Sequence, residues 1–210
     1  MMKIYSLISQ KGGTGKSTLA RQFAVLVGPS VLIDRDPQQT TRKWWERRQQ
    51  VEPAPEQPEL LDINGSQLTE AAHVLRQREG GSVFIDTRPA VDGPEAEAAQ
   101  VSDVVLIPVR PSPDDLEAVV ETLRIVRRLE RPAVLIVNAA KTSSRAIAAR
   151  AALSRYPVPV CPYHVADRTV YLDASLEGRG VGEMRGAVAA EAAAELQRVW
   201  NWVQEIAGEC

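Results

Sequence analysis

The chain has 210 residues, of which 44% are hydrophobic and 25% charged, and its formal net charge is −2. This composition is ordinary for a globular domain, and the overall charge would not attract nucleic acid, so DNA contact would require a local basic patch. No uninterrupted apolar run of about 18 residues is present, so we expect no transmembrane helix. Cys161 and Cys210 are the only cysteines. That number excludes a disulfide framework or a four-cysteine metal site and is typical of a cytoplasmic protein.

Short apolar runs alternate with amphipathic helical patterns along the chain, which predicts a mostly parallel sheet with helices on both faces. The predicted strands cover residues 4–8, 30–34, 60–63, 83–86, 104–107, 133–138 and 158–161. The predicted helices cover residues 19–27, 38–50, 67–78, 95–101, 114–129, 144–155 and 188–207. No internal repeat or linker interrupts this order. We therefore predict one doubly wound α/β domain over residues 1–210, with about seven strands.

A glycine-rich loop joins the first predicted strand to the first predicted helix. Its sequence is Gln10-Lys11-Gly12-Gly13-Thr14-Gly15-Lys16-Ser17-Thr18. Strand, glycine-rich turn and helix are the context of a phosphate-binding P-loop, because glycines let successive backbone amides surround a phosphate. In such a loop Lys16 reaches the β- and γ-phosphates, and the Ser17 hydroxyl binds Mg²⁺.

Two positions depart from the general P-loop pattern. Gln10 occupies the first glycine position, and a second lysine, Lys11, begins the loop. This form, K-G-G-x-G-K-[ST], resembles the deviant Walker A box of the ParA/MinD ATPases. The resemblance implies a P-loop NTPase fold that binds ATP and Mg²⁺, and an ATP-dependent homodimer in which Lys11 reaches the partner's nucleotide. By the same resemblance, the ATP-binding residues are Lys11, Gly12, Gly13, Thr14, Gly15, Lys16, Ser17 and Thr18.

Three acids follow predicted strands, where ligands of open α/β sheets bind. Residues 34–38, D-x-D-P-Q, resemble the switch I segment of this family, which implies that Asp36 orients the attacking water and Asp34 supports the metal. The alternative is that both acids cap the following helix. Residues 84–89 resemble switch II, which places Asp86 at Mg²⁺ or its water shell. Arg88 replaces a proline of that motif, and it would contact phosphate, contact the sister subunit or remain solvated.

The resemblance becomes weaker toward the C-terminus. The connector over residues 108–113, with three prolines in six residues, resembles a stretch of small plasmid-partition proteins that lies near the dimer or polymer contact, although a rigid turn explains it equally well. Asn138 would contact the base or cap its strand. The predicted catalytic residues are therefore Lys11, Lys16 and Asp36, with Ser17, Asp86 and Asp34 as metal ligands.

ParA relatives bind DNA without sequence preference through phosphate contacts. The candidate DNA-binding residues are Arg145, Arg150 and Arg168, with a solvated helix face as the alternative for each. A second basic cluster, residues 42–48, carries two adjacent tryptophans, of which at least one must pack or meet a partner. The C-terminal helix contains several acids, and Trp200 lies on its apolar stripe, so we expect core packing and no membrane binding.

The leading hypothesis is a ParA-type ATPase that segregates or positions a plasmid or chromosome, with a ParB-like partner that stimulates hydrolysis. Such a protein would be cytoplasmic and associated with the nucleoid. Because the loop begins at residue 10, we expect no signal peptide and no N-terminal DNA-binding extension. Two alternatives remain: the same switch positions a protein cargo, such as a chemoreceptor array or microcompartment, or the chain is a metabolic relative. Dethiobiotin synthetase and the nitrogenase iron protein are examples of the latter.

Overall fold

A single parallel sheet organises the computed structural model, which describes residues 1–63, 67–90 and 93–209. Its seven strands have the spatial order β3-β2-β4-β1-β5-β6-β7, and every neighbouring pair is parallel. The strands are β1 (Lys3–Leu7), β2 (Ser30–Asp34), β3 (Glu59–Leu60), β4 (Ser82–Asp86), β5 (Val104–Val109), β6 (Ala133–Ala140) and β7 (Val160–Ala166). The predicted doubly wound α/β fold is confirmed.

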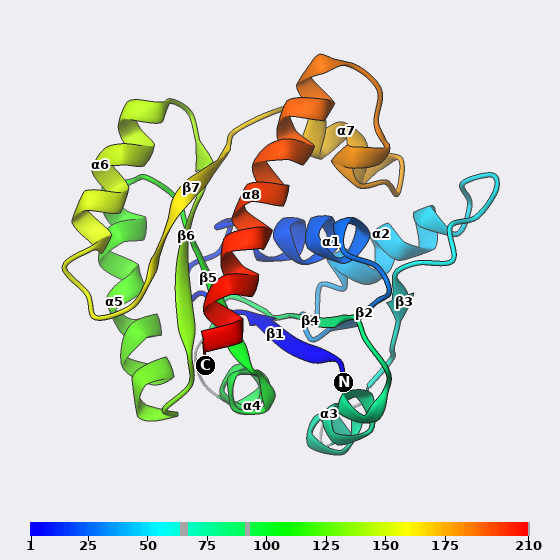
Figure 1. Cartoon of the computed structure of the whole chain (residues 1–210), viewed down its shortest axis with the longest axis horizontal. Coiled ribbons are helices and arrows are strands. Elements are labelled where there is room, and N and C mark those ends of the chain that lie inside the picture. Colours follow the sequence, from blue (N-terminus) through cyan, green and yellow to red (C-terminus); the bar gives the residue numbers. More distant parts are fainter. Residues whose placement is uncertain (64–66, 91–92, 210) are drawn as a thin grey trace.

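Helices cover both faces of the sheet, as Figure 1 shows. They are α1 (Lys16–Leu26), α2 (Thr40–Arg48), α3 (Leu68–Gln77), α4 (Pro94–Val101), α5 (Pro113–Arg128), α6 (Ser143–Leu153), α7 (Val170–Leu176), the 3₁₀ helix η2 (Val181–Glu183) and α8 (Ala187–Glu209). One core cluster joins the sheet to α1, α7 and α8, and two others join the opposite face to α3, α4, α5 and α6. None of the described helices is both long enough and apolar enough to cross a membrane.

The side-chain alternation of β1 explains this layering. Tyr5 points to the α1–α8 side of the sheet, and Ile4 points to the other side. Tyr5 belongs to an aromatic cluster in which its ring centroid lies 5.0 Å from that of Trp200, and Phe84 lies 5.3 Å from the same indole. Trp200 is 6% exposed. The predicted core packing of the C-terminal helix is therefore confirmed.

The extents predicted for two edge strands were wrong, and one short helix was missed. β3 is shorter than predicted, β7 continues to Ala166, and α7 was not predicted. β7 is an edge strand whose residues Pro162 and Tyr163 are exposed, so it has no continuous apolar run to reveal its length. The seven residues of α7 are too few to establish a helical period.

The sheet topology places the candidate site at its centre. β1 lies between β4 and β5, and the chain leaves β1 first toward β2 on one side and later reaches β5 on the other. Such a switch point is where open α/β sheets bind their ligands. Asp34 and Asp86 are register partners on β2 and β4, and Asp86 also pairs with Leu7 at the end of β1. The predicted acids and the glycine-rich loop are thereby brought together.

Candidate functional site

The loop after β1 has the backbone conformation of a phosphate cradle. Gly13 and Gly15 have φ values of +75° and +97°, which side chains disfavour. A Cβ atom on Gly15 would also collide with the side-chain amide of Asn138. Gly15 is the N-cap of α1 and has no side chain to cap the helix, so the first amide groups of α1 remain available to an anion.

Lys16 is a buried cation inside this cradle, with 5% of its surface exposed. Its Nζ donates to the carbonyl oxygens of Ser9 at 3.3 Å and Lys11 at 3.4 Å, which are long bonds for a charged donor. Burial lowers the pKa of Lys16, and the Asp86 carboxylate is the main charge that opposes the shift. An incoming phosphate would offer Lys16 shorter bonds to full negative charges than these carbonyls provide.

Asp86 is fully buried beside the P-loop. The Thr41 hydroxyl donates to its Oδ2 at 2.7 Å, whereas Oδ1 has no hydrogen-bond partner among the described residues. Burial raises the pKa of Asp86 to about 6, and the hydroxyls of Thr41 and Ser17 lower it in part. Magnesium prefers one or two protein oxygens together with phosphates and waters. The buried Oδ1 of Asp86 fits that role. Among the described residues, no cluster of three or more His, Cys, Asp or Glu ligands offers another metal site.

Asp34 and Asp36 organise the turn that leads into α2. Asp34 accepts hydrogen bonds from the backbone amides of Asp36 at 3.0 Å and Arg42 at 2.9 Å, and Asp36 accepts from the amide of Gln38 at 2.9 Å. Burial raises the pKa of Asp34, and these amide bonds lower it. The capping alternative therefore holds for Asp34, which bonds an amide in the first turn of α2, whereas Asp36 bonds only the turn before that helix. The roles of Asp36 toward water and of Asp34 toward the metal stay predictions.

Lys11 is bound within its own chain. Its Nζ donates to Asp115 at 3.2 Å and lies 3.8 Å from Asp114, both in the first turn of α5. Ser112 caps this helix and donates its hydroxyl to the same Asp115 oxygen. The connector over residues 108–113 therefore presents an anionic helix start to Lys11, a role that its prolines alone did not predict.

A small pocket of about 190 Å³ lies beside the loop, and it contains a cation that the sequence interpretation missed. Arg110 lines this pocket, and its Nη1 lies 3.9 Å from the position that a Cβ on Gly13 would occupy. Asn138 also lines it but donates its amide to the Thr14 carbonyl at 2.7 Å, so it braces the loop, and its contact with a base stays a prediction. In the sequence, Arg110 could have been recognised as a basic residue that directly follows a buried strand.

Two arginines have partners that the sequence did not predict. Arg88 pairs with the buried Glu95 at 2.9 Å, which contradicts a purely solvated loop residue. Arg168 pairs with Glu195 at 2.6 Å and Glu191 at 3.0 Å. Arg168 is thus paired with two carboxylates of its own chain, and its contact with DNA stays a prediction.

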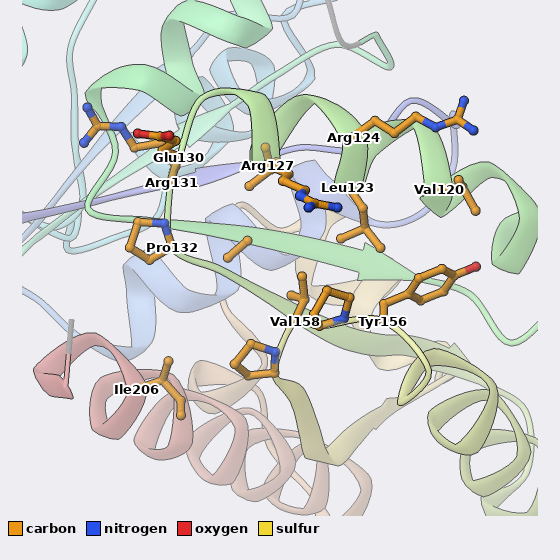
Figure 2. Close-up of a pocket in the computed structure, with 14 residues that line it drawn as sticks. Val120, Leu123, Arg124, Arg127, Glu130, Arg131, Pro132, Tyr156, Val158 and Ile206 are labelled. Atoms are coloured by element: carbon orange, nitrogen blue, oxygen red, sulfur yellow. The ribbon is translucent and has the colours of Figure 1, made fainter.

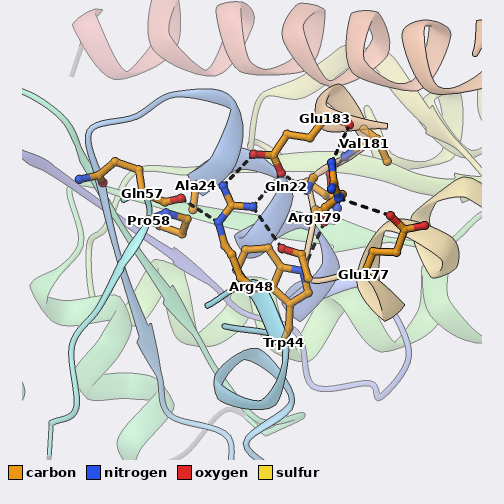
Figure 3. Close-up of polar contacts among 12 residues, drawn as sticks. Gln22, Ala24, Trp44, Arg48, Gln57, Pro58, Glu177, Arg179, Val181 and Glu183 are labelled. Atoms are coloured by element: carbon orange, nitrogen blue, oxygen red, sulfur yellow. Dashed lines mark hydrogen bonds and ion pairs between the residues drawn. The ribbon is translucent and has the colours of Figure 1, made fainter. Parts of the chain in front are cut away.

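Two residues of the basic cluster on α2, Trp44 and Arg48, are buried in the protein, whereas Lys43 is exposed. Arg48 forms a two-pronged ion pair with Glu183, with distances of 2.7 and 2.8 Å, and donates to the Gln57 carbonyl (Figure 3). It also stacks on Trp44, which is buried and donates to the carbonyl of Arg179. These contacts hold α2 against the segment that follows α7.

Other basic residues divide into engaged and exposed groups. Arg42 pairs with Asp62 at 2.7 Å, and Arg47 donates to a backbone carbonyl of α7. On α6, the Arg145 side chain is exposed and that of Arg150 is half-buried. DNA binding by Arg145 and Arg150 stays a prediction.

The cysteines do not support an iron–sulphur site. Cys161 is buried in the core cluster of α1 and α8, and burial raises the pKa of its thiol to about 11. An iron–sulphur cluster is held by several cysteine thiolates, and no group of three or more His, Cys, Asp or Glu ligands occurs among the described residues. Cys210 lies outside the described residues.

The chain is similar to known proteins in sequence and in fold. Residues 5–181 match the CobQ/CobB/MinD/ParA nucleotide binding domain. The chain is 30% identical to a maintenance of carboxysome distribution protein A of Gloeobacter kilaueensis, over 94% of this chain and 92% of that protein. The fold is similar to the ATP complex of a Cyanothece McdA variant, with a TM-score of 0.73, 20% identity, and coverage of 97% and 96%. It is also similar to a Borrelia burgdorferi plasmid partition protein, with a TM-score of 0.71, 18% identity, and coverage of 97% and 98%.

Proposed function

The chain belongs to the CobQ/CobB/MinD/ParA family of nucleotide-binding domains, and we propose that it is an ATPase whose ATP-bound dimer positions a large protein assembly. The observation that supports the ATPase part is that Lys16 and Ser17 of the glycine-rich loop both lie close to Asp86, whose Oδ1 has no hydrogen-bond partner among the described residues. The Gloeobacter relative is a maintenance of carboxysome distribution protein A, and this similarity favours a protein cargo over a plasmid or chromosome. The protein-cargo alternative from the sequence analysis is thus preferred to the leading hypothesis of a plasmid or chromosome cargo.

Each residue of the cradle has a distinct task in the proposed hydrolysis. The amides from Gly12 to Ser17 surround the phosphates, and Lys16 neutralises charge on the β- and γ-phosphates. Ser17 and Asp86 would hold Mg²⁺, which would supply charge neutralisation at the phosphates. Asp36 orients the attacking water; the Gln38 amide bonds only its Oδ1, so Oδ2 can accept from that water.

Lys11 makes the switch depend on two subunits. In the proposed dimer it leaves Asp115 and reaches the nucleotide of the partner. Its side chain is 35% exposed, so it can move without unpacking the core. A single chain would then bind ATP, but only a dimer would complete the site.

DNA serves in this proposal as the surface on which the dimer is retained, and a separate adaptor protein links the dimer to its cargo. Arg145 and Arg150 on α6 are the proposed phosphate contacts, because no described side chain forms an ion pair with either. Contacts of this kind carry no sequence preference and weaken steeply with salt.

The ATPase proposal is tested with purified wild type, Lys16→Ala and Asp36→Ala. We expect wild type to hydrolyse ATP slowly and to dimerise with ATP but not ADP. Lys16→Ala should bind neither nucleotide, whereas Asp36→Ala should dimerise with ATP and fail to hydrolyse it. Equal dimerisation of wild type with ATP, ADP and no nucleotide would refute the switch.

The cargo proposal is tested in the source organism by deleting the gene and imaging the shell-protein compartment or receptor array encoded nearest to it. We expect the assembly to cluster or lose its regular spacing, and wild type but not Lys16→Ala to restore it. Normal spacing together with loss of a plasmid or chromosome from daughter cells would assign the DNA cargo instead.

A further inference from the structure

A groove of about 650 Å³ lies at the end of the sheet where the strands begin, opposite the end that carries the P-loop (Figure 2). It is bordered by the end of α5, by Pro132 and Ala133 where β6 begins, and by residues 156–159 before β7. Since all seven strands are parallel, the P-loop after β1 lies at the carboxyl edge and this groove at the amino edge. The groove is therefore separate from the nucleotide site and from the Lys11 surface.

The floor of the groove is apolar. Figure 2 shows Leu123 of α5 facing Tyr156 and Val158 across the space, with Ile206 of α8 at one end. Tyr156, Val158 and Ile206 are each only half-buried, so this apolar surface remains in contact with water. A connected apolar surface of this kind is typical of a binding site.

The rim of the groove is basic. Arg127 and Arg131 are exposed, and neither has a hydrogen bond or ion pair from its side chain to any part of the chain that the structure describes. Arg124 pairs with Glu121, and Glu130 is the single acid of the lining residues. Arginines in the last turn of a helix stabilise its dipole, which accounts for Arg127. Arg131 lies beyond the end of α5, so helix-end stabilisation does not account for it.

We propose that this groove binds an amphipathic helix of a partner protein, with leucine-type side chains on the apolar floor and carboxylates paired with Arg127 and Arg131. Aromatic and arginine side chains around an apolar centre are the composition of protein-binding hot spots. DNA phosphates would use the arginines but leave the apolar floor unused. Because the groove lies opposite the P-loop, the partner helix binds equally to the monomer and to the ATP-bound dimer.

The test uses two synthetic 18-residue probe peptides measured by fluorescence anisotropy with the full chain. Both peptides carry leucine on one helical face, and the other face carries glutamate in the first and lysine in the second. We expect the glutamate peptide to bind in the micromolar range and the lysine peptide at least ten times more weakly. ATP or ADP should leave the affinity of the glutamate peptide unchanged.

Three variants locate the binding. Arg127→Glu combined with Arg131→Glu should weaken the glutamate peptide at least tenfold and improve the lysine peptide. Val120→Ser, which adds a hydroxyl to the groove wall, should weaken both peptides about threefold. The matched control, Arg198→Glu, changes an exposed arginine of α8 outside the groove and should change neither affinity.

Several results would overturn the proposal. One is failure of the glutamate peptide to bind wild type at 1 mM. A second is a loss of affinity in the Arg198→Glu variant as large as that in the double arginine variant. A third is that ATP abolishes binding of the glutamate peptide. Loss of DNA retention in the double arginine variant, without loss of peptide binding, would assign these arginines to nucleic acid.

Discussion

The contact between Lys11 and Asp115 leads to the most direct prediction for the proposed dimer. In the single chain Lys11 donates to a carboxylate that is 7% exposed, yet the proposed dimer needs the same lysine at the partner's nucleotide. Asp115→Asn removes the charge and retains the shape of the side chain. If the contact holds Lys11 back, this variant should dimerise more tightly with ATP.

The size of the effect follows from the geometry. A 3.2 Å charged contact with one partner about one-third exposed contributes on the order of 1 kcal/mol, between the values for surface and buried pairs. Forming one dimer releases two such lysines, so the total is about 2 kcal/mol. At about 1.4 kcal/mol per factor of ten, the dimer dissociation constant should fall about 30-fold.

Sedimentation in the hydrolysis-defective Asp36→Ala background, with ATP present, measures this constant. Asp114→Asn is the matched control, because Asp114 lies in the same helix turn but is 87% exposed and 3.8 Å from Lys11. It should change the constant less than threefold. A weaker dimer in the Asp115→Asn variant would show that Asp115 supports assembly, and an unchanged dimer would show that the contact has no regulatory effect.

Further predictions concern the nucleotide site and the fold. Arg110 lines the pocket beside the loop, and we expect it to contact phosphates that ATP and ADP share. Arg110→Gln should therefore weaken the binding of both nucleotides about tenfold in fluorescence titration; a loss for ATP alone would place the contact at the γ-phosphate. The folded pKa of Asp86 is raised from 3.8 to about 6, so its ionisation removes stability as the pH rises through 6, by up to about 3 kcal/mol. Asp86→Asn should therefore raise the melting temperature of the ligand-free protein at pH 8 more than at pH 4, and equal shifts would contradict the burial argument. Arg48→Met should lower the free energy of unfolding in urea by about 3 kcal/mol because Glu183 loses its charged partner, and adding Glu183→Gln should restore part of the loss.

The sequence motifs did not predict which cargo the protein positions. The P-loop and the switch segments predicted the family, but the pattern of those motifs reflects nucleotide binding and does not identify a cargo. DNA was the leading hypothesis, and it was the comparison with a carboxysome distribution protein that favoured a protein assembly. The surfaces that would meet a partner depend on side chains from several helices, which no local pattern describes.

Local patterns were sufficient for the parallel sheet, the P-loop and the acids at the ends of β2 and β4. Apolar periodicity and glycine positions are properties of neighbouring residues, so the sequence by itself determined these features. Contacts between distant residues were decided only by the tertiary structure. Lys11 binds Asp115, which lies 104 positions away in the sequence, and Arg48 binds Glu183, which lies 135 positions away. As a result, Lys11 is held within its own chain and Arg48 is buried. Chain folding alone sets which partner a charge finds, because an ion pair depends on distance in space and not on spacing in the sequence.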